Sequence, residues 1–139
     1  MTDRDEIVDI AARYTWAIDT RDYGALADVF TPDAYALLGG EACHGLGAIQ
    51  DRVARALDPL DASQHLVGSH VVDLGIEGNP DRARHRCQFQ AQHCREGANY
   101  IVAGSYSDRF VRTADGWRIE HRVLDVTWTE GDLSVLRRG

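Results

Sequence analysis

The chain has 139 residues, of which 44% are hydrophobic, and its 15 basic and 22 acidic side chains give a formal net charge of −7. This length predicts a single domain, residues 1–139, with one core and room for an internal pocket. Because the basic residues are scattered in an acidic chain, we expect neither nucleic acid nor an anionic membrane as a partner. A neutral or weakly polar small molecule is the expected ligand.

The ends and the cysteines indicate the compartment. The N-terminus lacks the apolar segment of a secretory signal, and no run of the sequence approaches the ~20 apolar residues of a membrane span. Cys43, Cys87 and Cys94 are odd in number and lack C-x-x-C spacing, which argues against a disulfide framework and a structural zinc site. We predict a soluble, cytoplasmic protein with reduced, mostly buried thiols.

The first half of the chain predicts three helices. Residues 3–19 place apolar side chains at helical spacing on one stripe, after Thr2 or Asp3 as N-cap. This stripe carries Tyr14, and Asp19 lies at the end of the helix. The following elements are punctuated by proline and glycine: a second helix at residues 23–30, a strand at 34–38, a turn at 39–40 and a third helix at 48–57.

From Ser63 onward the apolar pattern has a period of two, with turn signals at residues 78–81, 95–97 and 114–116. Four long antiparallel strands are expected. The strand from Arg82 alternates most clearly and places Cys87, Phe89 and His93 on its core side. His85, with His70 of the preceding strand, is expected at the surface or rim of the sheet. In the last strand the core-facing set changes parity after Val123, as a bulge requires. Helices followed by a curved sheet predict an α+β fold.

His65 and Asp19 form the strongest catalytic hypothesis. An imidazole is a suitable general base at neutral pH, and a carboxylate on its second nitrogen fixes the tautomer. A carboxylate at a helix C-terminus opposes the helix dipole, so Asp19 needs a compensating partner. The alternative is that Asp19 caps a turn and His65 binds a loop. Facing His65 toward the core requires a bulge near Gly68.

Three further polar residues are placed on core faces. Tyr14 needs a hydrogen-bond partner when buried and is either a substrate-polarising group or an ordinary core tyrosine. His93 and His121 fall on inward registers, from which their side chains would converge on one cavity. These histidines, with His65 and Asp19, lack the H-x-E or H-x-x-x-H spacing of metal ligands, so no metal site is expected.

Several motifs together resemble the SnoaL-like branch of the nuclear transport factor 2-like superfamily over nearly the whole chain. The matching runs are Arg13-Tyr14-x4-Asp19, Phe30-Thr31-Pro32-Asp33-Ala34, Gln64-His65 and Asp115-Gly116-Trp117-Arg118-Ile119. The resemblance implies a cone-shaped, curved mixed sheet wrapped around three N-terminal helices. It also implies that Asp19 and His65 stand where the family's dehydratases carry an Asp–His dyad, with Tyr14 and His93 at further site positions.

These observations predict a cofactor-independent, dehydratase-like lyase for a small hydrophobic or polycyclic hydroxylated compound. His65 would remove a proton, Asp19 would orient it, and Tyr14 and His93 would bind the carbonyl or assist the departing hydroxyl. The alternatives are a non-catalytic binding or partner-subunit module, and an isomerase or polyketide cyclase that uses the same pocket. The resemblance further suggests a homodimer or homotrimer through the sheet. The expected substrate-binding residues are Trp16, Phe30, Leu38, Phe89, His121 and Trp128.

Overall fold

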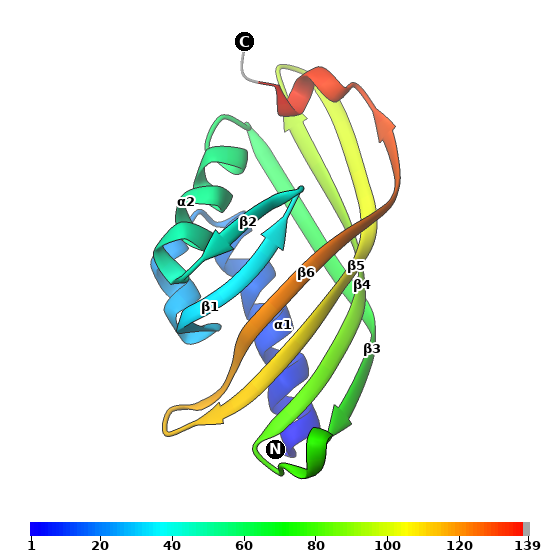
Figure 1. Cartoon of the computed structure of the whole chain (residues 1–139). Coiled ribbons are helices and arrows are strands. Elements are labelled where there is room, and N and C mark those ends of the chain that lie inside the picture. Colours follow the sequence, from blue (N-terminus) through cyan, green and yellow to red (C-terminus); the bar gives the residue numbers. More distant parts are fainter. Residues whose placement is uncertain (138–139) are drawn as a thin grey trace.

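The computed structural model describes residues 1–137 of the chain. Helical elements occupy mainly the first half and long strands the second (Figure 1). In chain order the elements are α1 (Asp3–Asp19), η1 (Tyr23–Asp28), β1 (Phe30–Leu38), β2 (Glu41–His44), α2 (Leu46–Leu57), β3 (Ala62–Leu74), η2 (Ile76–Gly78), β4 (Arg82–Arg95), β5 (Ala98–Thr113), β6 (Gly116–Gly131) and η3 (Leu133–Leu136), the η elements being 3₁₀ helices.

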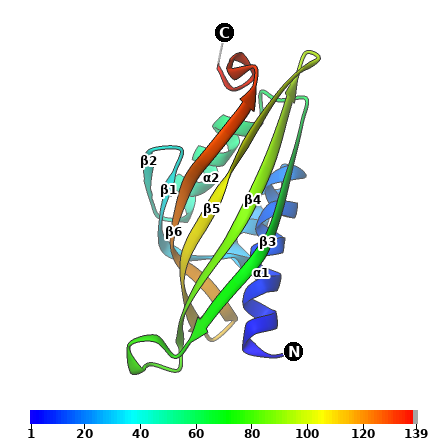
Figure 2. The same cartoon turned by 90° about the vertical axis from the view of Figure 1, so that its right-hand side faces the viewer.

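All six strands belong to one mixed sheet in the order β2-β1-β6-β5-β4-β3. The β1–β6 pair is parallel and the other pairs are antiparallel. The long strands curve, and α1 and α2 lie on the same side of the sheet, with α1 running alongside β3 (Figures 1 and 2). This arrangement confirms the predicted α+β cone. Within residues 1–137 no helix is both long and apolar enough to cross a membrane.

Helix α1 forms for the reasons that its sequence suggests. Thr2 and Asp5 make a reciprocal capping box, in which the backbone N–H of Asp5 donates to Thr2 Oγ1 and that of Thr2 to an Asp5 carboxylate oxygen. Acidic residues fill the first turn, where the helix dipole favours negative charge. The buried stripe consists of Ile7, Ile10, Ala11, Tyr14, Thr15, Ala17 and Ile18.

Trp117 connects the start of β6 to the first turn of α1 through hydrogen bonds. Its side chain is fully buried, and its ring N–H donates to Asp3 Oδ1 over 3.1 Å. The backbone N–H of Trp117 also donates to Glu6 Oε2 over 2.8 Å. A large apolar side chain of this kind contributes about 1.5–3 kcal/mol when buried. The contact holds the start of the central strand β6 against the N-terminal turn of α1, at the end of the helix opposite to Asp19.

The second predicted helix is a short 3₁₀ helix, and the chain has already become a strand at Phe30. Pro32 therefore lies inside β1, not beyond the end of a helix. The strand tolerates it because the parallel pairing with β6 is interrupted between Phe30 and Tyr35, so the missing N–H of Pro32 removes no ladder bond there. The strand thus begins four residues before the predicted position.

The glycine turn after β1 reverses the chain as predicted, and Gly39 and Gly40 both have positive φ angles. It leads into β2, which pairs with β1 in the segment between the predicted turn and the predicted third helix. Helix α2 begins at Leu46, two residues earlier than expected, and ends at Leu57 as predicted.

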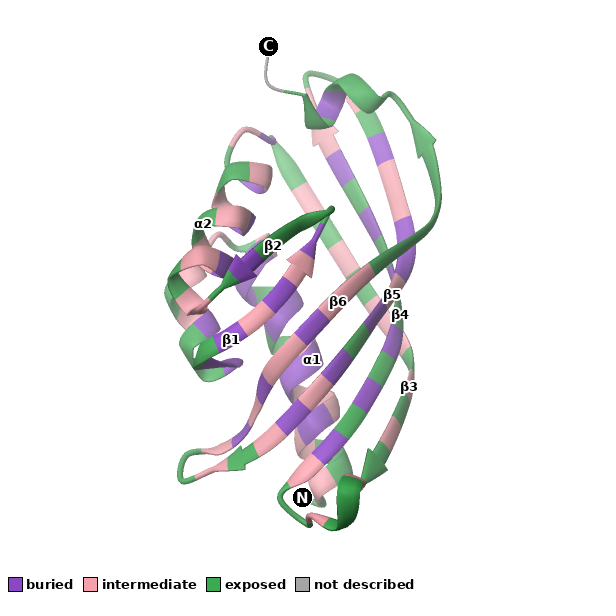
Figure 3. Ribbon diagram, viewed as in Figure 1, coloured by how far each residue is buried: buried purple, intermediate pink, exposed green. Residues whose placement is uncertain are grey.

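Strand β4 alternates strictly between buried and exposed positions (Figure 3). Its buried face carries Ala83, His85, Cys87, Phe89, Ala91 and His93. His85 is only 2% exposed, which corrects the expectation that it lies on the sheet surface or rim. An imidazole this deep in the fold requires polar partners of its own.

Bulges decide which side chains of β3 and β6 face inward. In β3, Ser69 and His70 stand where the facing strand has only Cys87, since Gly68 pairs with Gln88 and Val71 with Arg86. In β6, Glu120 and Thr127 are each one residue extra relative to β5. Each extra residue inverts the inside–outside alternation beyond it. The bulge predicted near Gly68 is confirmed, and the predicted parity change in β6 occurs earlier than expected.

Candidate active site

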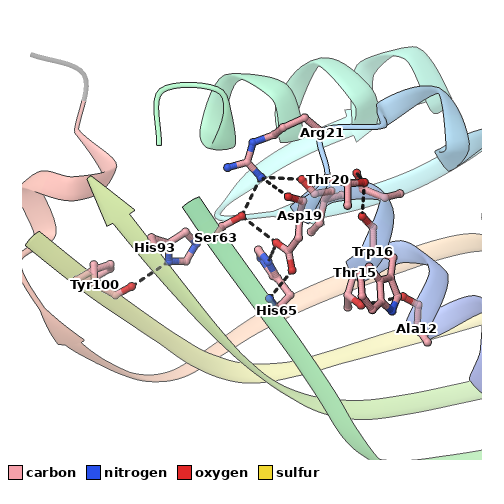
Figure 4. Close-up of polar contacts among 12 residues, drawn as sticks. Ala12, Thr15, Trp16, Asp19, Thr20, Arg21, Ser63, His65, His93 and Tyr100 are labelled. Atoms are coloured by element: carbon pink, nitrogen blue, oxygen red, sulfur yellow. Dashed lines mark hydrogen bonds and ion pairs between the residues drawn. The ribbon is translucent and has the colours of Figure 1, made fainter. Parts of the chain in front are cut away.

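The carboxylate of Asp19, at the C-terminus of α1, meets two side chains of β3 (Figure 4). His65 Nδ1 lies 2.7 Å from Asp19 Oδ1, and the hydroxyl of Ser63 donates to the same oxygen over 2.8 Å. The backbone N–H of His65 donates to Asp19 Oδ2 over 2.6 Å. Three donors thus satisfy the carboxylate and hold it against the strand.

The turn at the end of α1 supplies a positive charge that compensates the negative charge of Asp19 at the helix C-terminus. Arg21 adopts a left-handed conformation, with φ of 61°, which turns the chain back beside the helix end. Its guanidinium Nη1 donates to the carbonyl of Ile18 over 2.8 Å and to Ser63 Oγ over 2.9 Å. A positive charge at a helix C-terminus offsets both the dipole and the carboxylate of Asp19.

The hydrogen bonds around Asp19 also determine the protonation state of Asp19 and the tautomer of His65. Burial raises the pKa of Asp19, but the hydrogen bonds from His65 and Ser63 outweigh it and leave that pKa below its ordinary value of 3.8. The carboxylate is therefore ionised at neutral pH and accepts the Nδ1–H of His65. This fixes the tautomer of neutral His65, so that Nε2 carries the lone pair. Nε2 of His65 is therefore the nitrogen that can accept a proton.

A cavity of about 400 Å³ opens beside His65, within the size range of small-molecule sites. Most of its lining is apolar, and it comes from α1, α2, η3 and the inner face of the sheet. The polar side chains that line it are Tyr14, Arg52, His65, His93, Tyr100, Tyr106 and Thr129. An apolar chamber with a few converging polar groups suits an organic molecule with one or two oxygen substituents.

His93 stands beside His65, with ring centroids 5.7 Å apart and nearly perpendicular planes. Its Nδ1 lies 3.0 Å from the carbonyl oxygen of Tyr100, which can only accept, so Nδ1 carries the hydrogen. Burial lowers the pKa of His93, and the nearby His65 lowers it further. His93 is therefore neutral at pH 7 and presents Nε2 as a hydrogen-bond acceptor.

Tyr14 lines the cavity from α1 and is 3% exposed. Its ring packs edge-on against Phe30 and Tyr106, and the guanidinium carbon of Arg122 lies 4.5 Å from the ring centroid. Burial raises the pKa of Tyr14 above its usual value. The phenol thus stays protonated over a wide pH range and remains a hydrogen-bond donor.

The structure brings together most of the predicted site. Tyr14, His65 and His93 line one cavity with Leu38 and Phe89, while Asp19 lies behind His65 and contacts it. Four predicted substrate-binding residues are not among those that line this cavity: Trp16, Phe30, His121 and Trp128. Trp16 projects from the outer face of α1 and is 72% exposed, and Phe30 is buried beneath Tyr14.

The wrong predictions for His121 and Trp128, both on β6, have a common cause. The extra residue Glu120 reverses the alternation before His121, so that Arg122 faces inward and His121 stacks on Tyr35. The extra residue Thr127 reverses it again and turns Trp128 to the outer surface, where it is 42% exposed. The predicted inward positions of His121 and Trp128 are therefore wrong by one residue of register.

Two contributors to the hydrogen bonds around Asp19 were missed from the sequence. Ser63 lies two residues before His65 and so shares its strand face, a signal that the alternation of β3 could have provided. Arg21 gave no such signal, because its contact with Ser63 depends on the turn that follows α1. Tyr100 and Thr129 also line the cavity, and their inward positions follow from pairings and a bulge that the sequence leaves open.

The helices and the curved mixed sheet define the cystatin-like, nuclear transport factor 2-like fold. The SnoaL-like domain family matches residues 1–123. The chain therefore belongs to the SnoaL-like family, as the sequence resemblance predicted.

Individual relatives cover nearly the whole chain. Terrestric acid biosynthesis cluster protein E of Penicillium crustosum is 31% identical over 144 residues, which cover 97% of this chain and 90% of the relative. A Novosphingobium aromaticivorans structure provisionally assigned as an aromatic ring hydroxylase has 27% identity, covers 97% and 96% of the two chains and superposes with a TM-score of 0.85. A hexachlorocyclohexane dehydrochlorinase, LinA type 2, shares the fold at a TM-score of 0.82, with 15% identity and coverage of 98% and 93%.

Proposed function

We propose that this protein is a cofactor-independent lyase that removes water from a small, largely apolar hydroxylated compound. The observation that carries the proposal is the 2.7 Å contact between His65 Nδ1 and Asp19 Oδ1 at the wall of a mostly apolar cavity. A carboxylate-bound imidazole in such a place is a general base, whose contribution is typically about 10²–10⁴-fold in rate.

The reaction starts with removal of a proton from carbon by His65 Nε2. The electron pair of the broken C–H bond forms the new C=C bond as the C–O bond to the neighbouring hydroxyl breaks. The departing hydroxide takes the proton from the His65 imidazolium, so water leaves and the base returns to its neutral state. Asp19 stabilises the intermediate imidazolium and keeps the ring in place.

The other polar groups fit complementary roles. Tyr14, protonated and buried, donates a hydrogen bond to a substrate carbonyl and so acidifies the neighbouring C–H. Neutral His93 accepts a hydrogen bond from the substrate hydroxyl through Nε2, which orients the leaving group. The apolar lining, from Leu38, Leu57, Phe89, Val102 and Leu124, favours a ring system over a charged metabolite.

The comparisons support elimination without identifying the substrate. The dehydrochlorinase neighbour is named for loss of hydrogen chloride, a reaction that needs a base but no oxidant, and the fungal relative is named for a biosynthetic cluster. Another neighbour is provisionally named a hydroxylase, so names alone do not choose the reaction. The proposal depends on the dyad and its cavity.

A substrate screen tests the proposal. The purified protein is incubated with a panel of cyclic and polycyclic β-hydroxy ketones, and conjugated alkene formation is followed by absorbance and by mass spectrometry. We expect turnover of at least one compound, abolished in His65→Ala, which keeps the backbone N–H bonded to Asp19, and unchanged in His44→Ala, whose side chain is exposed. Tight binding without turnover, or turnover that survives in His65→Ala, would refute the lyase.

Isomerisation or cyclisation is the second candidate, because the same base and cavity serve any reaction that starts with removal of a proton from carbon. The protonated Tyr14 would stabilise the enolate in either case. Mass spectrometry separates the two, since elimination lowers the mass of the product by one water and isomerisation leaves it unchanged.

A further inference from the structure

A second group of polar side chains lies on the inner face of the sheet, among residues that do not line the cavity. It consists of His70 on β3 and His85 and Cys87 on β4, whose ligand atoms all lie within 4.8 Å of one another. His85 and Cys87 are buried and His70 is half-buried. Two imidazoles and a thiol are the donor set that Zn²⁺ and Co²⁺ prefer.

The backbone explains how the three side chains meet. His85 and Cys87 are alternate residues of one strand and share its inner face. His70 stands in the β3 bulge, directly opposite Cys87 in the pairing. Ser69, with φ of 54°, turns the chain there and directs His70 onto His85. The bulge therefore adds a ligand from one strand to the pair supplied by its neighbour.

The distances suit a tetrahedral ion. His70 Nδ1 and His85 Nε2 are 3.0 Å apart, whereas two nitrogen ligands on a tetrahedral zinc ion are about 3.3 Å apart at bond lengths of about 2.0–2.1 Å. A separation of about 3.5 Å between nitrogen and thiolate sulfur, expected for the same ion, lies within the observed limit of 4.8 Å. Widening the separation of the two nitrogens by about 0.3 Å would bring them to the spacing of tetrahedral ligands.

Asp108 and Arg122 hold His85 in place through the ring nitrogen that points away from His70. Asp108 Oδ2 lies 2.8 Å from His85 Nδ1, so Nδ1 carries the hydrogen and Nε2 keeps its lone pair directed toward His70. Arg122 Nε and Nη2 donate to the two Asp108 oxygens over 2.7 and 2.8 Å. A carboxylate on the distal nitrogen of a histidine is the usual outer partner of a metal-ligating imidazole.

We propose that His70, His85 and Cys87 bind one transition-metal ion, with Zn²⁺ as the natural candidate, and that a water molecule or another exchangeable ligand occupies the fourth position. Binding displaces the thiol proton of Cys87 to solvent. The thiolate offsets the positive charge of Arg4 near His70, while Asp108 balances Arg122. The site is separate from the proposed lyase dyad and clamps β3 to β4 at the bulge.

Cobalt spectroscopy on the full-length protein tests the proposal directly. After chelator treatment and its removal, Co²⁺ is titrated in and the visible and near-ultraviolet absorption recorded, followed by displacement with Zn²⁺. We expect one equivalent to bind, with the thiolate-to-cobalt charge-transfer band that reports a cysteine ligand. Absence of stoichiometric binding by the wild-type protein would overturn the proposal.

Paired variants identify the ligands without any activity assay. Cys87→Ser should remove the charge-transfer band, and His70→Asn should weaken Co²⁺ affinity by about 100-fold or more, since loss of an outer partner alone costs about 10–100-fold. Cys94→Ser and His44→Asn, at the half-buried cysteine and an exposed histidine, should change neither. Because His70 is half-buried, His70→Asn remains informative if Cys87→Ser does not fold. Unchanged binding in His70→Asn would refute the site.

Discussion

Ser63 and His65 bind the same oxygen of Asp19, one through its hydroxyl and the other through Nδ1. Since they are alternate residues on β3, the strand itself sets their spacing and aims both at the end of α1. The carboxylate cannot rotate without breaking three hydrogen bonds at once. Preorganisation of this kind lets an imidazole accept a proton without further rearrangement.

The first prediction concerns Asp19→Asn. An amide has one acceptor oxygen, whereas the carboxylate has two. The amide NH₂ group therefore faces one of the hydrogen-bond donors of Ser63 and His65, and the His65 imidazole loses its fixed tautomer. We expect kcat to fall by about 10²–10⁴-fold with little change in KM. Steady-state kinetics on a substrate from the screen measures both constants.

A matched control for this variant is Asp28→Asn. The Asp28 side chain is 80% exposed and lies 4.0 Å from Arg118, so its replacement should leave both constants unchanged. Equal losses in the two variants would show that Asp19 has no special role in positioning His65.

The second prediction concerns acid stability. The pKa of Asp19 in the folded state lies below its ordinary value of 3.8, so its contribution to the free energy of unfolding is complete above that value. As the pH falls below it, the unfolded chain binds the proton first and the contribution is lost until the pH passes the folded pKa. Urea unfolding between neutral pH and about pH 3 should therefore show a steeper loss for the wild type than for Asp19→Asn. Parallel curves would contradict the lowered pKa.

The third prediction uses the cavity. Ala56 on α2 lines it, so Ala56→Phe should fill part of the volume without displacing well-packed neighbours. We expect ligand affinity to fall by about tenfold or more, since the new ring occupies the ligand's place, while the melting temperature changes little. Isothermal titration calorimetry and thermal unfolding measure the two effects.

Ala54→Phe serves as the control for the filled cavity, because Ala54 contributes to a shallow surface depression on the other side of α2. It should leave affinity unchanged. Equal affinity of Ala56→Phe and the wild type for a bound substrate would show that ligands bind elsewhere.

The fourth prediction concerns Arg122, which is 1% exposed, forms two hydrogen bonds with Asp108 and packs against the rings of both Tyr14 and Tyr106. Arg122→Met leaves the Asp108 carboxylate buried without its cation and should lower the free energy of unfolding by about 3–5 kcal/mol. The measurement is urea unfolding in the presence of a chelator, so that metal binding does not contribute.

The double variant Arg122→Met, Asp108→Asn checks the cause. Removing both charges should cost clearly less than the sum of the two single substitutions, because no unpaired charge remains. Additive losses would mean that packing of Arg122 on the tyrosines, not its ion pair, carries the effect.

The sequence predicted the contact between Asp19 and His65 because the position of each residue depends on a local pattern. The apolar stripe of α1 places Asp19 at the helix end, and the alternation of β3 with a bulge near Gly68 turns His65 inward. Both features can be recognised within short segments of the sequence. The same reasoning placed Tyr14 and His93 at the cavity, since each lies on a regular element whose period continues without interruption through it.

Prediction failed where regular periods are interrupted. The positions of His121 and Trp128 depend on two extra residues of β6, and nothing in the local sequence distinguishes Glu120 or Thr127 from paired residues. The second helix failed because Pro32 was interpreted as a stop signal, whereas an unpaired stretch of β1 accommodates it. The group at His70, His85 and Cys87 was missed because strand pairing, not ligand spacing along the chain, brings His70 to the other two.

The two extra residues of β6 decide which of its side chains form the inner surface of the sheet. Between them, Arg122, Leu124 and Val126 face inward, the latter two as part of the cavity wall. If Glu120 paired as a regular ladder residue, the alternation would continue unchanged and His121, Val123 and Asp125 would face inward instead, which would replace a guanidinium and two apolar groups with an imidazole, an apolar group and an acid. The presence of a bulge at one position of the strand thus decides which side chains form the inner face, without any substitution among those side chains.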